Sequence, residues 1–223
     1  MCAPASLLAD QPMKARRFLG ACILVGGVVT AGVWLGHRLD PTRSGIGAQS
    51  DRDACAGAHD DVTPPQLASF LAIDQSAQML SNRDFRGFVW IVDFVFTRCR
   101  GLCPLLSARL ALVRDHVKDE RTRFVSFTID PEHDTPSALA AYARRWGPND
   151  PRWRLLRTDQ ATLSRVASSL DPAAAGGLDL ATHSDRFFLI DRAGDVRGSF
   201  ASGDRSGQQC LLESIAHLTA SGS

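Results

Sequence analysis

The stretch FVWIVDFVF, from Phe88 to Phe96, decides the fold of this chain. It is a run of aromatic and β-branched residues interrupted only by Asp93, a composition that predicts a strand buried on both faces. An unpaired buried charge is costly, so Asp93 is expected to face either a site or a hydrogen-bond partner. The strand runs directly into the sequence TRCRGLCP (97–104), which carries two cysteines four positions apart.

Strands and helices alternate along the rest of the chain. Apolar residues at one-face helical spacing predict a helix over 104–117, and FVSFTI (124–129) predicts a second strand. Thr135 followed by Pro136 is typical of a helix start, here of a helix that extends to residue 146. The remaining predicted elements are a strand at 153–156, a helix from Asp159 to residue 170, a hairpin of 186–190 and 196–200, and a helix at 211–218. This order predicts an α/β domain with a mixed central sheet over residues 64–223.

The composition excludes two broad classes of protein. Hydrophobic residues make up 44% of the 223 residues and charged residues 22%, which is typical of a globular chain and not of a disordered one. Lysine and arginine number 25 against 24 aspartate and glutamate residues, so the formal net charge is +1. A nucleic-acid-binding protein usually carries a basic face, and we therefore expect no nucleic-acid partner.

An uncharged apolar run occupies residues 18–36 (FLGACILVGGVVTAGVWLG). As a helix this run spans roughly 28 Å, close to the ~30 Å hydrocarbon core of a bilayer. Lys14, Arg16 and Arg17 precede it, and such positive flanks tend to stay on the cytoplasmic side. We therefore expect a cytoplasmic N-terminus at 1–17, a transmembrane anchor at 18–36, a flexible tether at 37–63 and an exported domain after it.

Two alternatives to a retained anchor are a buried core helix and a cleavable signal peptide. A core helix usually has a polar face, which this run lacks. The small residues at 29–31 are typical of a cleavage site, but the apolar run continues past them to Leu35. Both the anchor and the signal peptide place the domain outside the cytoplasm. The short basic N-terminal region favours a bacterial inner membrane, with the domain in the periplasm.

The cysteine loop lies where a predicted strand ends and a predicted helix begins. Ligands of open α/β sheets bind at the carboxyl ends of strands, and a helix N-terminus favours thiolate over thiol. Arg98 and Arg100 add positive charge beside Cys99 and Cys103. A thiolate pair of this kind can exchange with disulfides or bind a soft metal such as Cu(I). A structural disulfide, or two unpaired core thiols, is the simpler alternative.

Four blocks of the sequence together resemble the Sco/SenC family of copper chaperones. FTRCRGLCP (96–104) is similar to the family signature FTxCxxxCP, and TIDPEHDTP (128–136) is similar to its T-[VI]-D-P-E-x-D-T-P segment. YARRWG (142–147) fits the aromatic-rich helix end that follows, and His183 stands where the family has its metal-binding histidine. The resemblance covers roughly residues 64–218.

The resemblance implies a thioredoxin-like fold tethered to the membrane, and a metallochaperone more than an enzyme. Family members bind one copper, as Cu(I) or Cu(II), through both motif cysteines and the distal histidine, so the implied metal ligands are Cys99, Cys103 and His183. Asp130 matches the family's acidic residue near the site, with an implied role beside the metal or in docking. The implied partners are the copper-bearing subunit of cytochrome c oxidase, whose copper centre is loaded or whose thiols are maintained, or another copper chaperone.

The sequence departs from the family pattern at Arg100 and Gly101, where members commonly have proline and then an acidic residue. A positive charge there disfavours a bound cation and stabilises free thiolates. An extracytoplasmic thiol–disulfide oxidoreductase is therefore the alternative function, with Cys99 as the attacking thiolate and Cys103 as the resolving thiol. A thiol peroxidase fits less well, because the threonine lies two positions before Cys99 instead of three. Cys55 and Cys210 are the remaining exported cysteines, and a disulfide between them is one possibility.

Overall fold

The computed structural model describes residues 64–147, 150–170 and 185–221. The predicted anchor at 18–36, the tether at 37–63 and His183 lie outside these described residues. Within the described ranges, none of the helices combines the length and the apolar character that crossing a bilayer requires. The anchor therefore stays a prediction from the sequence.

A seven-stranded sheet forms the centre of the domain, in the order β2-β1-β5-β4-β3-β6-β7. β3, β4 and β5 run parallel, whereas β1, β6 and β7 pair antiparallel with their neighbours β5, β3 and β6. The mixed central sheet predicted from the sequence is confirmed. The strands are β1 (Leu71–Asp74), β2 (Met79–Ser81), β3 (Val89–Val95), β4 (Thr122–Thr128), β5 (Trp153–Arg157), β6 (Arg186–Ile190) and β7 (Val196–Ala201).

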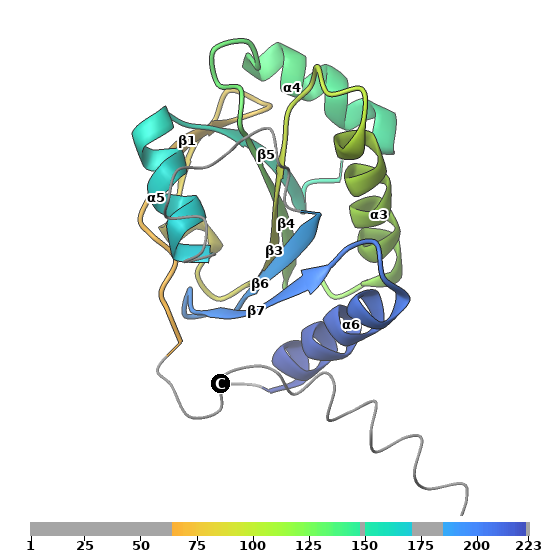
Figure 1. Ribbon diagram of the computed structural model, residues 1–223. Helices are drawn as coiled ribbons and strands as arrows, with labels where there is room; N and C mark the ends of the chain where they lie inside the picture. The colour runs from red at the N-terminus through yellow and green to blue at the C-terminus, as the bar shows by residue number, and fades with distance from the viewer. Residues whose placement is uncertain (1–63, 148–149, 171–184, 222–223) are drawn as a thin grey trace, which may run out of the picture. The chain divides into compact units, whose positions relative to one another are not determined.

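Within the described residues, four α-helices and two short 3₁₀ helices pack around the sheet (Figure 1). They are η1 (Asn82–Phe85), α3 (Leu102–His116), α4 (Pro136–Ala143), η2 (Arg144–Trp146), α5 (Gln160–Leu170) and α6 (Arg205–Ala220). The predicted start of α4 is confirmed, because the Thr135 side chain accepts a hydrogen bond from the Ala138 N–H and Pro136 occupies the first turn.

Two helices begin earlier than the sequence pattern predicts. α3 starts at Leu102 and not at Pro104, so Cys103 is already part of its first turn. α6 starts at Arg205, six residues before the predicted position, because the Asp204 carboxylate caps the N–H groups of Ser206 and Gly207. The first turns of α6 are polar, and an apolar periodicity cannot detect them.

The hairpin of β1 and β2 was not predicted. Its strands have only four and three residues, too few for a periodicity of two to stand out. Their turn is built by Asp74, whose carboxylate accepts hydrogen bonds from the N–H groups of Ser76 and Gln78. Ala77 in this turn has a φ of 61°.

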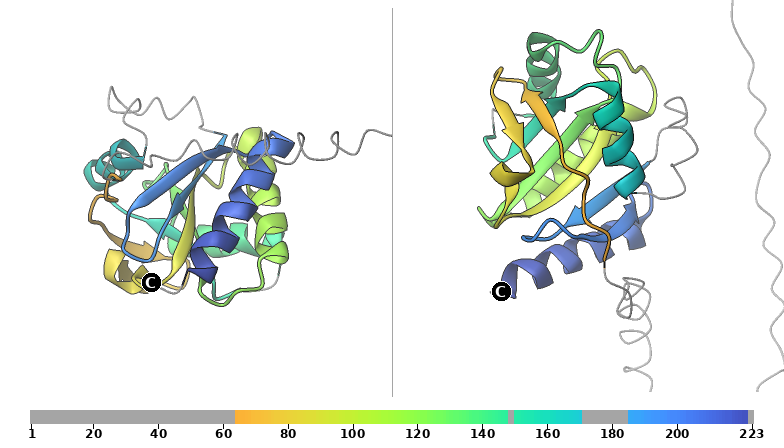
Figure 2. Two further views of the ribbon diagram at one scale, coloured as in Figure 1. Left: turned by 90° about the horizontal axis from the view of Figure 1, so that it is seen from below. Right: turned by 90° about the vertical axis from the view of Figure 1, so that its left-hand side faces the viewer.

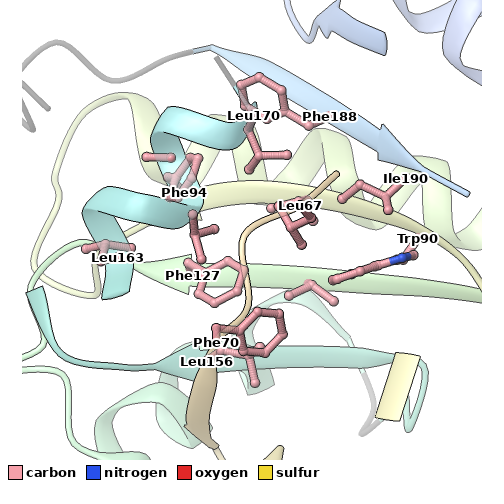
Figure 3. Close-up of a cluster of buried hydrophobic side chains, with 14 of the residues drawn as sticks. Leu67, Phe70, Trp90, Phe94, Phe127, Leu156, Leu163, Leu170, Phe188 and Ile190 are labelled. Carbon is pink, nitrogen blue, oxygen red and sulfur yellow. The ribbon is translucent and has the colours of Figure 1, made fainter. Parts of the chain in front are cut away.

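The two faces of the sheet are covered by different helices (Figure 2). We call the side that packs against α5, η1 and the segment before β1 the α5 face, and the side that packs against α3, α4 and α6 the α3 face. Sheet side chains on the α5 face include Trp90, Val92, Phe94, Val125, Phe127 and Phe188. Figure 3 shows this cluster, in which side chains from the sheet and from α5 point toward one another. Sheet side chains on the α3 face include Val89, Ile91, Phe124, Leu155, Phe187 and Leu189.

Candidate metal centre

The cysteine loop lies at the carboxyl end of β3, where the sequence predicts it. β3 ends at Val95 and α3 begins at Leu102, so six residues make the connection. Cys99 lies inside this loop and Cys103 in the first turn of the helix. The parallel neighbour β4 ends at the same edge of the sheet, and the segment 129–135 that follows it lies beside the cysteine loop.

The two cysteines are close together but differ in exposure. The backbone N–H of Cys103 points at the Cys99 sulfur, with 3.4 Å between N and Sγ. Cys103 is only 1% exposed, whereas Cys99 is partly exposed. Both are free thiols, which excludes a structural disulfide between them in this structure.

The surroundings shift the pKa values of the two thiols in opposite directions. Partial burial disfavours the Cys99 thiolate, but hydrogen bonds from the Cys103 thiol and from the N–H groups of residues 101–103 outweigh it and lower the pKa of Cys99. Burial raises the pKa of the Cys103 thiol to about 12, and its hydrogen bond to Cys99 adds to this rise. Cys99 is therefore the reactive sulfur, and Cys103 stays protonated until something displaces its proton.

A buried carboxylate holds the start of the cysteine loop. The Asp134 side chain is fully buried and accepts hydrogen bonds from the Thr97 N–H at 3.1 Å and from the Thr97 hydroxyl at 2.5 Å. It also accepts a hydrogen bond from the Thr128 hydroxyl at the end of β4. Thr97 lies two residues before Cys99, so this carboxylate fixes the cysteine loop against β4.

Asp130 lies in the same segment and contacts the residue next to Cys99. Its carboxylate accepts hydrogen bonds from the Arg98 guanidinium, the shorter at 2.6 Å, and lies 2.7 Å from Nδ1 of His133. Partial burial opposes ionisation, but the hydrogen bonds from His133 and Arg98 outweigh it and lower the pKa of Asp130. Asp130 therefore acts on the cysteine loop through Arg98, and the hydrogen bonds of its carboxylate among the described residues are to Arg98 and His133 and not to a sulfur.

Asp93 lies on the α3 face, because it stands two residues after Ile91 on β3 and side chains two apart on a strand share a face. It is fully buried, and neither carboxylate oxygen meets the geometry of a hydrogen bond within the described part of the chain. Burial raises the pKa of Asp93 to about 7, against a smaller opposing effect of the Ser126 hydroxyl on the neighbouring strand. Its charge in turn adds to the rise of the pKa of Cys103.

Sequence reasoning located the cysteines, Asp130 and Asp93, but it missed Asp134 and Thr97. The only signal for them was their presence in the two blocks that carry the family resemblance. His183 lies outside the described residues, and the described ranges contain no group of three or more potential metal ligands. Cys210 is disulfide-bonded, while its predicted partner Cys55 also lies outside the described residues.

Comparison with known proteins places this fold in one family. The family model described as SCO1/SenC matches residues 60–220, and the chain belongs to this family. The domain has the mixed α/β, thioredoxin-like fold of Sco proteins. The copper-bound crystal structure of yeast Sco1 superposes with a TM-score of 0.59 at 18% identity, over 73% of this chain and 97% of that one. A SCO1/SenC family lipoprotein from Bacillus anthracis gives a TM-score of 0.61 at 24% identity, over 72% of this chain and 98% of that one.

Curated relatives carry the same family name. The SCO1 protein homolog of Bacillus subtilis is 28% identical over 150 residues, which cover 64% of this chain and 78% of that protein. The mitochondrial SCO2 homolog of Danio rerio is 28% identical over 141 residues, which cover 61% of this chain and 47% of that protein. The chain thus spans less than half of the length of the mitochondrial relative.

Proposed function

We propose that this protein is a copper chaperone that holds one copper ion through Cys99, Cys103 and His183. In this proposal it delivers the ion to the copper-bearing subunit of cytochrome c oxidase, or keeps the thiols of that copper centre ready for loading. A second copper chaperone is the other candidate partner. The single observation that carries the proposal is the free dithiol at the first turn of α3, in a chain that belongs to the SCO1/SenC family.

The donor set fits copper chemically. Thiolates are soft ligands that select Cu(I), and a set of two sulfurs and one imidazole suits copper in either oxidation state. Structures of ScoI from Bradyrhizobium japonicum and of yeast Sco1 are described as having copper bound. Binding of Cu(I) to both sulfurs displaces the proton of Cys103, which this buried thiol otherwise keeps.

Carboxylates of the segment after β4 hold the loop before the cysteines. Asp134 fixes Thr97, and Asp130 draws the Arg98 guanidinium toward the segment after β4. In the proposed site these carboxylates orient the loop, and neither is a ligand. In this proposal Asp130 acts beside the metal through Arg98, which is one of the two roles that the family resemblance implies for it.

Copper titration of the reduced full chain tests the ligand set. We expect one copper per chain for the wild type, near-complete loss of Cu(II) binding in His183→Ala and a more modest loss of Cu(I) affinity. His133→Ala is the matched control, because it removes an exposed histidine that contacts Asp130 and is not a proposed ligand. Equal copper binding by the wild type and His183→Ala would show that the ligand assignment is wrong.

A second candidate function is thiol–disulfide exchange, and the opposite shifts of the two thiol pKa values favour it. The Cys99 thiolate attacks a target disulfide and releases one target thiolate, forming a mixed disulfide. Cys103 then gives up its proton and attacks the Cys99 sulfur, which leaves an intramolecular disulfide and a fully reduced target. Disulfide reduction by His183→Ala at the wild-type rate, together with no copper uptake by either protein, would establish this function in place of the first.

We further propose that residues 18–36 anchor the protein in the inner membrane, with a single pass and the domain in the periplasm. The apolar run and the basic residues before it support this arrangement. We expect the full chain to fractionate with membranes after a high-salt wash, and deletion of residues 1–36 to abolish that association. Labelling of Cys99 by a membrane-impermeant thiol reagent in intact cells tests the topology, and protection from the reagent would contradict it.

A further inference from the structure

A groove lies beside the cysteine loop, at the same edge of the sheet. It has a volume of about 700 Å³ and is lined by β1, the start of β2, the segment after β4 and the start of α5. Asp130 is part of its wall and also binds Arg98, the residue before Cys99. The hairpin of β1 and β2 and helix α5 can be followed in the right-hand view of Figure 2. An occupant of this groove would therefore contact Asp130, the ion-pair partner of the residue before Cys99.

Two exposed apolar side chains line the groove. Leu71 on β1 and Met79 on β2 are each 59% exposed, and the two strands are direct antiparallel neighbours. Large exposed hydrophobic residues are few in the described ranges, where the others are Leu105 and Leu112. Two of them on adjacent strands of one groove mark an apolar contact surface.

The polar part of the groove is acidic. Glu132 and Asp159 line it, and neither forms an ion pair within the residues that the structure describes. Asp159 caps α5 through Thr162, which lowers the pKa of this carboxyl and keeps it ionised. The basic residue of the lining, Arg157, donates its Nε–H to the Pro131 carbonyl at 2.6 Å. Arg98 neutralises Asp130, and Arg157 is one positive charge against Glu132 and Asp159, so the groove keeps one net negative charge.

We propose that this groove is the docking surface for the polypeptide that receives copper, and that it binds a segment in which an apolar side chain neighbours a basic one. The apolar side chain contacts Leu71 and Met79, and the basic side chain pairs with Glu132 and Asp159. The segment then places the recipient's metal ligands beside Cys99. This inference rests on the proposed function, because it names where the recipient binds.

Copper transfer measures this docking directly. The copper-loaded full chain is mixed with the reduced, metal-free copper-bearing domain of cytochrome c oxidase from the same organism, and the second-order transfer rate is recorded. We expect Leu71→Gln/Met79→Gln to slow transfer about tenfold while taking up copper like the wild type, since loss of central apolar contacts weakens an interface by more than ~1 kcal/mol. Leu112→Gln is the matched control, because Leu112 is 69% exposed on α3 and does not line the groove.

The contribution of the acidic residues to docking is tested by the salt dependence of the transfer rate. We expect Glu132→Gln to slow transfer about two- to threefold at low ionic strength, with the difference vanishing at high salt, because rim charges act mainly on the association rate. Glu120→Gln is the control, since Glu120 is exposed just before β4, at the opposite end of that strand. Unfolding temperatures close to the wild-type value establish that each variant is folded.

The outcomes separate this inference from the function on which it rests. If the wild type takes up no copper, the proposed function is wrong, and the docking proposal that rests on it is wrong as well. Normal uptake with equal transfer by the wild type and Leu71→Gln/Met79→Gln overturns the docking surface alone. Transfer from the loaded wild type to the oxidase domain is required, and its absence would overturn the recipient named here. A dimer of this chain that dissociates in the double variant would show that the groove binds a second copy instead.

Discussion

The α5 face and the α3 face of the sheet differ in what they bury. On the α5 face, the sheet side chains are apolar and largely aromatic, and Phe70 and Phe127 meet edge to face with ring centroids 5.1 Å apart. On the α3 face, the buried side chains include Asp93, Ser126 and Ser107, and the Ser107 hydroxyl lies 2.8 Å from the Tyr142 hydroxyl. Cys103 is buried on this second side.

The difference shows how the domain separates stability from chemistry. Apolar burial stabilises the fold without directional requirements, and the cluster on the α5 face supplies a large part of it. Buried polar groups stabilise little and need hydrogen-bond partners, but a buried charge adds to the effect of burial on the pKa of a neighbouring thiol. Among the polar groups of the α3 face, Asp93 acts on Cys103, whose pKa its charge raises further.

Phe127→Ala tests the stabilising role of the α5 face and has the largest expected effect. Phe127 is fully buried and contacts Phe70 and Phe94, so we expect a loss of about 3–5 kcal/mol in the free energy of unfolding, measured with urea. The alkylation rate of Cys99 in the folded variant should stay at the wild-type value. Leu112→Ala, at an exposed position, should change stability by less than ~0.5 kcal/mol. A loss below 1 kcal/mol for Phe127→Ala would contradict the role given to this face.

Asp93→Asn tests the polar character of the α3 face through pH. The pKa of Asp93 is about 7 in the folded protein against 3.8 for the ordinary carboxyl, so the folded state keeps a proton that the unfolded chain releases above pH 4. The contribution of this group is fully present below pH 4 and is lost as the pH rises through 7, a change of roughly 4 kcal/mol at 1.36 kcal/mol per pKa unit. We therefore expect the stability of Asp93→Asn relative to the wild type to rise by up to about that amount between pH 4 and pH 8. A pH-independent difference would show that Asp93 is ionised normally.

Asp134→Asn tests how the cysteine loop is attached to the α3 side of the sheet. One carboxylate oxygen that accepts hydrogen bonds becomes an N–H₂ donor, so at least one buried donor loses its acceptor. We expect a loss of about 1–3 kcal/mol in stability and a changed pH dependence of Cys99 alkylation. Thr128→Val removes one donor to the same carboxylate and should have a smaller effect. An unchanged alkylation profile in a destabilised Asp134→Asn would limit this residue to a structural role.

Arg98→Gln has the smallest expected effect on stability. The Arg98 side chain is 59% exposed, and exposed ion pairs contribute at most about 1 kcal/mol. We expect a decrease of less than ~1 kcal/mol in the free energy of unfolding and a further decrease of this difference at high salt. Arg121→Gln, which removes a second exposed ion pair away from the site, is the control. A decrease above 2 kcal/mol would show that the ion pair with Asp130 stabilises the loop more than an exposed pair does.

Long apolar elements of the fold could be predicted from the sequence, and short or polar ones could not. β3 is buried along its whole length, so its sequence is an almost continuous apolar run from which a buried strand can be predicted. β1 depends on pairing with β5, a contact with residues about 80 positions away, and β2 pairs with β1. Strands of four and three residues carry no periodicity of their own. α6 begins with polar residues behind an Asp cap, which a search for apolar spacing overlooks.

The candidate site divides in the same way. Cys99 and Cys103 are only four positions apart, so the sequence alone shows a cysteine pair at the junction of a predicted strand and a predicted helix. Asp134 reaches Thr97 across 37 positions, only because β3 and β4 pair in parallel and end at the same edge. The groove formed by Leu71, Met79 and Glu132 draws on three separate segments, so it exists only in the folded chain.

The unequal depth of the two sulfurs imposes an order on every exchange at this loop. A molecule arriving from solvent meets Cys99 first, since Cys103 is almost completely covered. An incoming ion or thiol therefore binds Cys99 first and Cys103 second. It leaves in the reverse order. The Cys99 sulfur thus governs the association rate of an incoming ion, and the Cys103 sulfur governs its dissociation rate.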